Sequence, residues 1–345
     1  MLSNKENEFL MNSELTGGIS AKTNPLENGQ EKYLFFSLLI SITYATILTY
    51  LPIDGFRDRD NYLIYAEYSL DIFQSHLDQG LGYTLVNEPL WLLINILLSF
   101  FLYPEDCVRV IVFFSSFVVS FVILRAYPKY FLLIFLFLLV PQVLKNHIIH
   151  LRQGMAIAVF LFGWFSKNTS IRWLFIILSS FIHSSFFFIL VLLLLNNIFL
   201  MLSFSWGWLL FFYVLVGLFL DFAGAGLATH LGARQADELQ SLEMKTSGLG
   251  FLLWLFFSGI LILEGKNFMR RYSFSLFVLI VYLSGYFFLP VTARVFESTL
   301  LLVLISSLYL TSYRKLAFYG IFTFYFFFDW YQRLEWSAFG WGATS

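Results

Sequence analysis

Long apolar runs dominate this sequence. Stretches of about 15 to 22 residues, rich in Phe, Leu and Ile, recur from Tyr33 to near the C-terminus. A helix of that length matches the hydrocarbon core of a bilayer, which is about 30 Å thick. Of the 345 residues, 59% are hydrophobic and only 12% are charged, so a soluble domain of this length could not cover the apolar surface. We therefore expect an all-α polytopic integral membrane protein.

The apolar runs predict about ten to twelve transmembrane or re-entrant helices in one membrane domain, residues 33–329. The first 32 residues are polar and lack an apolar core, so we expect a disordered cytoplasmic tail and not a signal peptide. Residues 330–345 form a C-terminal tail that we expect in the periplasm. The expected helices cover residues 33–53, 88–103, 108–124, 130–146, 151–166, 173–202, 206–221, 248–263, 272–290, 295–313 and 316–328.

Four short basic loops predict the orientation, because loops rich in Lys and Arg stay cytoplasmic. With all four inside, the loop 54–87 and the C-terminal tail lie outside, while the side of the loop 221–247 stays open. The number of crossings then requires the helix 88–103 to be re-entrant or interfacial, and the helix 173–202 to bend back near His183. The basic loops contain Arg125 and Lys129, Lys167 and Arg172, Lys266 with Arg270 and Arg271, and Arg314 and Lys315.

Charge and cysteine content exclude some functions and one kind of cross-link. The chain has 21 basic and 22 acidic residues, so no basic excess is available for binding a nucleic acid. Cys107 is the only cysteine, which excludes an internal disulfide, and we interpret it as a small buried apolar residue.

Charged and protonatable residues interrupt the apolar sequence at a few places, and charges beside membrane spans are rare unless they have a function. The first group lies in the loop 54–87, where Arg57 and Asp60 occur close to Tyr62 and Tyr65. The tyrosine spacing of three puts both rings on one face if the segment is helical. Aromatic rings and carboxylates together suit sugar binding, although an interfacial tyrosine belt with solvated charges explains the same residues.

Asp58 and Asp60 form a DxD pattern, which could hold a divalent cation against a pyrophosphate. The intervening Arg59 could instead pair locally with both acids. No other metal site is expected.

Two further charges begin expected helices. Proline at the first turn and a carboxylate favoured by the helix dipole give Glu88-Pro89 a purely structural explanation beside a catalytic one. At Arg152 the dipole opposes the guanidinium, so an anion should compensate it. A substrate phosphate or one of the loop acids could be that anion. Gly154 permits close helix packing beside it.

His183 lies in the middle of an apolar run, flanked by Ser184 and Ser185. The imidazole is either neutral and hydrogen-bonded within the core or transfers a proton near neutral pH. Arg294 begins another expected span and has Glu297 three residues later. A structural ion pair and a phosphate clamp explain Arg294 equally well.

Taken in order, these motifs resemble the EpsG family of polytopic proteins, which overlaps the Wzy-type polymerases of O-antigen and capsule repeat units. The likeness covers roughly residues 33–312. The motifs are Asp60 with Tyr65, EPxWxxxN from Glu88 to Asn95, LRQGMA from Leu151 to Ala156, FIHSS from Phe181 to Ser185, and Arg294.

The resemblance implies polymerisation of a surface polysaccharide (O-antigen, capsule or exopolysaccharide) at the outer face of the bacterial inner membrane. The donor would be a growing glycan on undecaprenyl pyrophosphate, and the acceptor a hydroxyl of the next lipid-linked repeat unit. Arginines would stabilise the leaving pyrophosphate without a metal cofactor. His183 would be the first candidate for the base, followed by Asp60 and Glu88. The implied catalytic residues are Arg152, His183, Arg294, Asp60 and Glu88, and the implied substrate-binding residues are Arg57, Tyr62, Tyr65, Asn95 and Gln153.

The implied partners are the lipid bilayer, a lipid-linked oligosaccharide, and a chain-length regulator and flippase of the same pathway. Two alternatives remain open. A single-step membrane glycosyl- or acyltransferase would need much the same residues. A transporter or flippase would line a path with its intramembrane charges, and pseudo-repeated halves, which we do not find, would favour it.

Overall fold

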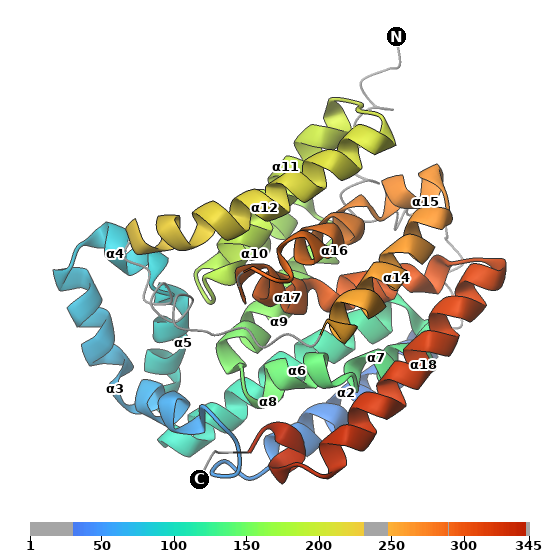
Figure 1. The fold of residues 1–345 in the computed structure, drawn as a ribbon. Helices are drawn as coiled ribbons and strands as arrows, with labels where there is room; N and C mark the ends of the chain where they lie inside the picture. The colour runs from blue at the N-terminus through green and yellow to red at the C-terminus, as the bar shows by residue number, and fades with distance from the viewer. Residues whose placement is uncertain (1–29, 231–247, 289, 343–345) are drawn as a thin grey trace. The chain divides into compact units, whose positions relative to one another are not determined.

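The computed structural model describes residues 30–230, 248–288 and 290–342 (Figure 1). Every regular element in these ranges is an α-helix or a short 3-10 helix, and the one extended pairing described is an isolated antiparallel bridge between Phe56 and Gly342. The expected all-α fold is therefore confirmed. The first 29 residues of the expected cytoplasmic tail and most of the loop 221–247 lie outside the described residues.

The described chain forms two compact units. The first unit contains residues 30–187 and 322–342, and the second contains residues 188–230 and 248–321 apart from residue 289. Two helices, α11 (Ser185–Met201) and α18 (Ser312–Leu334), pass from one unit to the other.

In the first unit, α6 packs against α2, α3 and α9, and α9 in turn packs against α8 and α10. The residues expected as an outer loop, 54–87, contain two helices, α3 and α4. The helices of this unit are α2 (Gln30–Thr49), α3 (Arg59–Asp78), α4 (Leu81–Val86), α5 (Pro89–Ser99), α6 (Pro104–Ala126), η1 (Pro128–Tyr130), α7 (Phe131–Leu138), α8 (Pro141–Ile148), α9 (Leu151–Trp164), α10 (Thr169–Ser180) and η3 (Ser337–Gly340).

In the second unit, α16 packs against α12, α14 and α17. Phe277 of α16 is fully buried and stacks on Tyr213 of α12, with 4.0 Å between the ring centroids. The helices that lie only in this unit are α12 (Trp206–His230), α14 (Leu249–Leu263), α15 (Lys266–Arg271), α16 (Ser273–Gly285), α17 (Pro290–Ser306) and η2 (Ser307–Tyr309).

Two of the expected helices are broken. The prediction of one continuous helix over residues 130–146 was wrong, because α7 and α8 meet at an angle of 73°. Pro141 has no N–H to donate and forces Val140 into an extended conformation (ψ 128°), so the helix cannot continue through it. The long expected helix 173–202 is interrupted between Ser180 and Ser185, next to His183, where a break was predicted.

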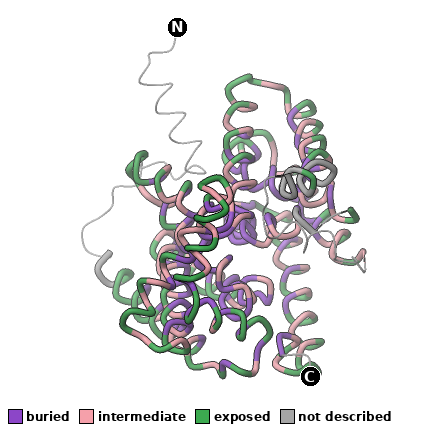
Figure 2. Tube along the Cα trace, turned by 90° about the vertical axis from the view of Figure 1, so that its left-hand side faces the viewer, coloured by how far each residue is buried: buried purple, intermediate pink, exposed green. Residues whose placement is uncertain are grey.

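Figure 2 marks the exposed residues along the helices, and many of these residues are large and apolar. Phe35, Leu97 and Phe101 are each more than 60% exposed, which would be costly in water and is expected in contact with lipid. Among the described residues, α6 and residues 292–309 are long and apolar enough to cross a membrane, and the bent pair α7–α8 would be a third span. Eight shorter apolar helices of 10–17 residues accompany them. The chain is an all-α polytopic membrane protein.

Candidate functional site

Glu88 and Arg152 form an ion pair across 64 residues of sequence. Nη1 of Arg152 lies 2.5 Å from Oε2 of Glu88, and the two side chains are 17% and 8% exposed. Glu88 precedes α5, and its backbone occupies the left-handed region (φ 60°, ψ 49°), which is uncommon for a residue other than glycine and clusters at functional sites. The anion that compensates the guanidinium at the start of α9 is thus Glu88, which opens the expected helix 88–103, whereas the expected candidates were a substrate phosphate and the acids of the loop 54–87.

The same carboxylate binds the turn between α10 and α11. The Ser184 N–H donates a hydrogen bond to Oε1 of Glu88 at 3.2 Å, and the Leu90 N–H donates to the Phe181 carbonyl at 3.0 Å. Since the carboxylate contacts Arg152 with one oxygen and the turn with the other, it joins α5, α9 and the turn that carries His183. Three of the motifs expected to form the site therefore meet at one carboxylate.

Two tyrosines of α3 complete the surroundings of Arg152. The guanidinium carbon lies 5.5 Å from the ring centroid of Tyr65, and Tyr62 shares a side-chain hydrogen bond with Arg152. Both rings pack edge-on against Trp91, at centroid distances of 5.8 and 6.2 Å. Burial raises the pKa of Tyr62, so its phenol is neutral at physiological pH. The predicted common face of Tyr62 and Tyr65 is present, and it faces the ion pair.

Two donors in this cluster have no hydrogen-bond acceptor among the described residues. They are Nε of Arg152 and Nε1 of Trp91, both buried. A buried donor without an acceptor costs about 1 to 3 kcal/mol, so native structures rarely keep one without a reason. N–H groups of this kind suit a ligand rich in oxygen, such as a phosphate or a sugar.

His183 is buried, and its ring is held by the residue two positions later. Nδ1 lies 3.2 Å from the Ser185 N–H and 2.7 Å from Ser185 Oγ. Because a backbone N–H can only donate, it favours a lone pair on Nδ1 and the ring proton on Nε2. The hydroxyl permits the opposite tautomer, in which Nδ1–H donates to Oγ and Nε2 carries the lone pair. The two contacts of Ser185 thus favour opposite tautomers, so either ring nitrogen of His183 can carry the lone pair.

The structure does not bring Arg57 or Asp60 to this cluster. Arg57 donates from Nε to the Gly342 carbonyl (3.1 Å) and from Nη2 to the Gly340 carbonyl (2.7 Å), so it anchors the C-terminal segment. Asp60 and Asp58 are exposed, and neither forms an ion pair with Arg59 in the described part of the chain. Within that part, no group of three or more His, Cys, Asp or Glu side chains converges as a metal site would.

Three other expected residues occupy separate positions. Asn95 is fully buried in α5 and donates to the carbonyl of Trp91 one turn earlier, at 2.9 Å. Gln153 is buried in the first turn of α9, next to Arg152. Arg294 is half-buried on α17, in the second unit.

Two arginines near the site were missed from the sequence. Arg59 lies on the same buried face of α3 as Tyr62, three residues away, and is only 3% exposed. The spacing of three was the available signal, but Arg59 was interpreted as a local partner of the flanking aspartates. Arg109 lies near the start of α6 and donates to the Thr49 carbonyl at 3.0 Å. An arginine near the edge of an apolar run gives no sequence signal for such a position.

These features define a class: a polytopic helical membrane protein with a buried arginine–carboxylate pair beside tyrosines and an ordered histidine turn. The chain belongs to the EpsG family, whose family model matches residues 32–341. That membership suggests a function of the polysaccharide polymerase type. Comparison with curated proteins and with solved structures gave no match.

Proposed function

We propose that the protein polymerises undecaprenyl-pyrophosphate-linked oligosaccharide repeat units into a surface polysaccharide at the outer face of the bacterial inner membrane. The observation that carries this proposal is the buried Glu88–Arg152 pair in a member of the EpsG family. The pair holds a guanidinium in place next to tyrosine rings of the kind that pack against sugars. Lipid-linked oligosaccharide and the bilayer are the direct partners, with a flippase and a chain-length regulator in the same pathway.

In the proposed reaction, the acceptor hydroxyl oxygen attacks the anomeric carbon of the donor glycan. The bond from that carbon to the pyrophosphate oxygen breaks, and the pyrophosphate leaves with the electron pair. Arg152 stabilises the negative charge that develops on the leaving group, because Glu88 and Tyr62 fix its orientation while its Nε has no acceptor among the described residues. Arg294 is proposed as a second guanidinium for the same pyrophosphate. No cofactor is required by this scheme.

The hydroxyl proton needs an acceptor, and His183 is the proposed base. The role requires the tautomer in which Nδ1–H donates to Ser185 Oγ, because only then does Nε2 have a lone pair for the substrate. In the other tautomer, Nε2–H would orient a substrate oxygen, and Glu88, which the adjacent Ser184 N–H contacts, would take the proton. Tyr62 and Tyr65 are proposed to contact the sugars, and Asn95 and Gln153 to support them.

Deletion of the gene, followed by analysis of surface glycan length, tests the function. We expect loss of polymer with retention of glycan that carries one repeat unit, and recovery of polymer with the wild-type chain. Loss of single-repeat glycan as well would indicate an earlier transferase or a flippase and would contradict the polymerase. Expression of the Glu88→Gln variant in the deletion strain then links the phenotype to the site.

A further inference from the structure

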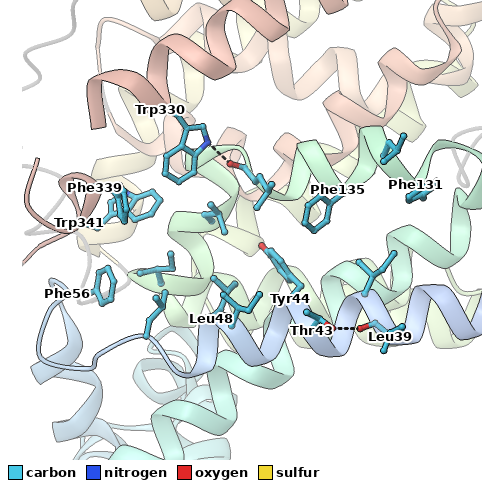
Figure 3. Close-up of a pocket in the computed structure, with 17 residues that line it drawn as sticks. Leu39, Thr43, Tyr44, Leu48, Phe56, Phe131, Phe135, Trp330, Phe339 and Trp341 are labelled. Carbon is cyan, nitrogen blue, oxygen red and sulfur yellow. Dashed lines mark hydrogen bonds between the residues drawn. The ribbon is translucent and has the colours of Figure 1, made fainter. Parts of the chain in front are cut away.

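An apolar groove lies in the first unit, and its walls do not include Glu88 or Arg152. Its volume is about 600 Å³, a size typical of ligand sites. The walls are formed by α2, α7, α8, the end of α18 and the C-terminal segment (Figure 3). Residues that characterise the walls are Tyr44, Leu48, Phe56, Phe135, Trp330 and Trp341.

The groove presents hydrocarbon and aromatic surface to its occupant. The polar atoms in the walls are directed to the backbone: Trp330 Nε1 donates to the Leu139 carbonyl (3.0 Å), and the Tyr44 hydroxyl donates to the Leu138 carbonyl (3.1 Å). The groove follows α2 from Leu39 to Leu48, which corresponds to about 14 Å of helix, and continues past the end of α2 to Leu51. A site of this length and composition suits a long hydrocarbon chain.

Two arginines lie at one end of this groove. The Arg59 guanidinium carbon is 5.8 Å from the ring centroid of Phe56, and Arg109 reaches the Thr49 carbonyl at the end of α2. Phe56 lies at the opposite end of the groove from Phe131 (Figure 3). The charge of Arg109 disfavours the charge on Arg59, and neither arginine has a carboxylate partner in the described part of the chain.

Burial and mutual repulsion make this arrangement costly without an anion. Arg59 is buried, and its Nε has no hydrogen-bond acceptor among the described residues. Burial lowers the pKa of Arg59 to about 10, and the charge of Arg109 acts in the same direction, yet the guanidinium stays charged at neutral pH. A buried guanidinium (Arg59) and a half-buried one (Arg109) that interact electrostatically suit a phosphate with more than one negative charge.

We propose that the groove binds the polyprenyl chain of the lipid-linked glycan and that Arg59 and Arg109 bind its phosphate. The lipid's identity rests on the proposed function. The charge favours it over membrane phospholipid, because a polyprenyl phosphate or pyrophosphate carries about two negative charges and a phosphodiester headgroup only one. Arg59 acts electrostatically on Tyr62, which hydrogen-bonds Arg152, so the phosphate end of the groove adjoins the candidate site.

The test uses photolabelling of the purified full-length protein in phosphatidylcholine nanodiscs with a diazirine-bearing polyprenyl phosphate. We expect labels on α2, α7 and α8. Ile47→Trp should reduce labelling several-fold, because Ile47 lines the groove and its exposed side chain can be enlarged without repacking the core. Ile42→Trp is the matched control, since Ile42 is exposed on the same helix outside the groove. Equal labelling of both variants, or labels elsewhere, would overturn the proposal.

A second pair of variants tests the phosphate. Arg109→Gln should weaken probe binding by about 10- to 100-fold, because one charge-assisted contact is lost. Arg125→Gln, at the other end of α6, should leave binding unchanged. Excess unlabelled polyprenyl phosphate should compete, whereas equal competition by phosphatidylglycerol would identify an ordinary phospholipid site and reject this one. The assay needs no turnover, so its failure is distinct from failure of the polymerase proposal, which glycan length reports.

Discussion

The backbone N–H of Ser184 donates a hydrogen bond to the carboxylate of Glu88, 96 residues earlier in the chain. Glu88 precedes α5 and Ser184 follows His183, so this bond fixes the histidine turn relative to the ion pair with Arg152. The turn and the pair therefore behave as one structural group, and Arg152→Lys, Glu88→Gln and Ser185→Ala each disturb one part of it.

Arg152→Lys should strongly reduce polymerisation. An ammonium cannot reproduce the planar fork that contacts Glu88 and Tyr62 while keeping a donor for the leaving group. Loss of a contact made mainly in the transition state should cost about 2 to 4 kcal/mol, or about 30- to 1,000-fold in rate. The measurement is glycan length and the initial rate of polymer formation at matched expression level.

Arg314→Lys provides the matched control for this variant. Arg314 pairs with Glu264 at 2.8 Å, and that carboxylate is as buried as Glu88, with 8% of its side chain exposed. The pair lies in the second unit, so a lysine there should leave the rate nearly unchanged. Full-length polymer from Arg152→Lys would remove Arg152 from the proposed mechanism.

Glu88→Gln should destabilise the protein as well as inactivate it. Removing one partner leaves a buried guanidinium without its counter-charge, which typically costs about 3 to 5 kcal/mol. The double variant Glu88→Gln with Arg152→Gln should recover much of that stability but no activity, because no charge then remains unpaired. Thermal unfolding of the purified protein in detergent measures the stability. If the double variant were no more stable than Glu88→Gln, the pair would not couple as the structure indicates.

Ser185→Ala should slow polymerisation if His183 is the base. The variant keeps the Ser185 N–H but removes the hydroxyl, and with it the only contact between these two residues that stabilises a lone pair on Nε2. Folding should be little affected, because the backbone bond to Nδ1 remains. An unchanged rate would assign His183 the role of hydrogen-bond donor through Nε2. Ser179→Ala, on the preceding helix α10, supplies the control, because the Ser179 hydroxyl donates to the Ile176 carbonyl within that helix.

Cysteine labelling tests the orientation. Ser75 and Ser337 are exposed, and we expect Cys at either position to react with an impermeant reagent in right-side-out vesicles. Native Cys107 is fully buried, so the background should be low. The Arg57 N–H donates to the Trp341 carbonyl, so the segment 54–58 and the C-terminal segment share one side of the membrane. Labelling of both positions only after permeabilisation would reverse the orientation, and labelling of one alone would contradict the contact.

The membrane class and the helical fold could be predicted because long apolar runs have one structural solution in a bilayer. The need of Arg152 for an anion followed from the helix dipole alone. The identity of that anion did not, because Glu88 had a sufficient local explanation and its contact depends on how three helices pack. The contacts of Arg57 could not be predicted either, since nothing local shows that its donors reach Gly340 and Gly342. The break before Pro141 was within reach of sequence rules and was overlooked.

Gly154, in the family motif around Arg152, allows close packing of two helices. A Cβ at this position would collide with the Asn146 carbonyl, so only glycine lets α9 approach α8 this closely. Gly163, farther along the same helix, meets the backbone of α10 in the same way, where a Cβ would lie 2.9 Å from the Arg172 carbonyl. Because neither glycine has a Cβ, α9 packs closely between α8 and α10, with Arg152 on its first turn. In relatives whose α9 packs this closely against α8, glycine should persist at position 154 even where the arginine at position 152 has been replaced.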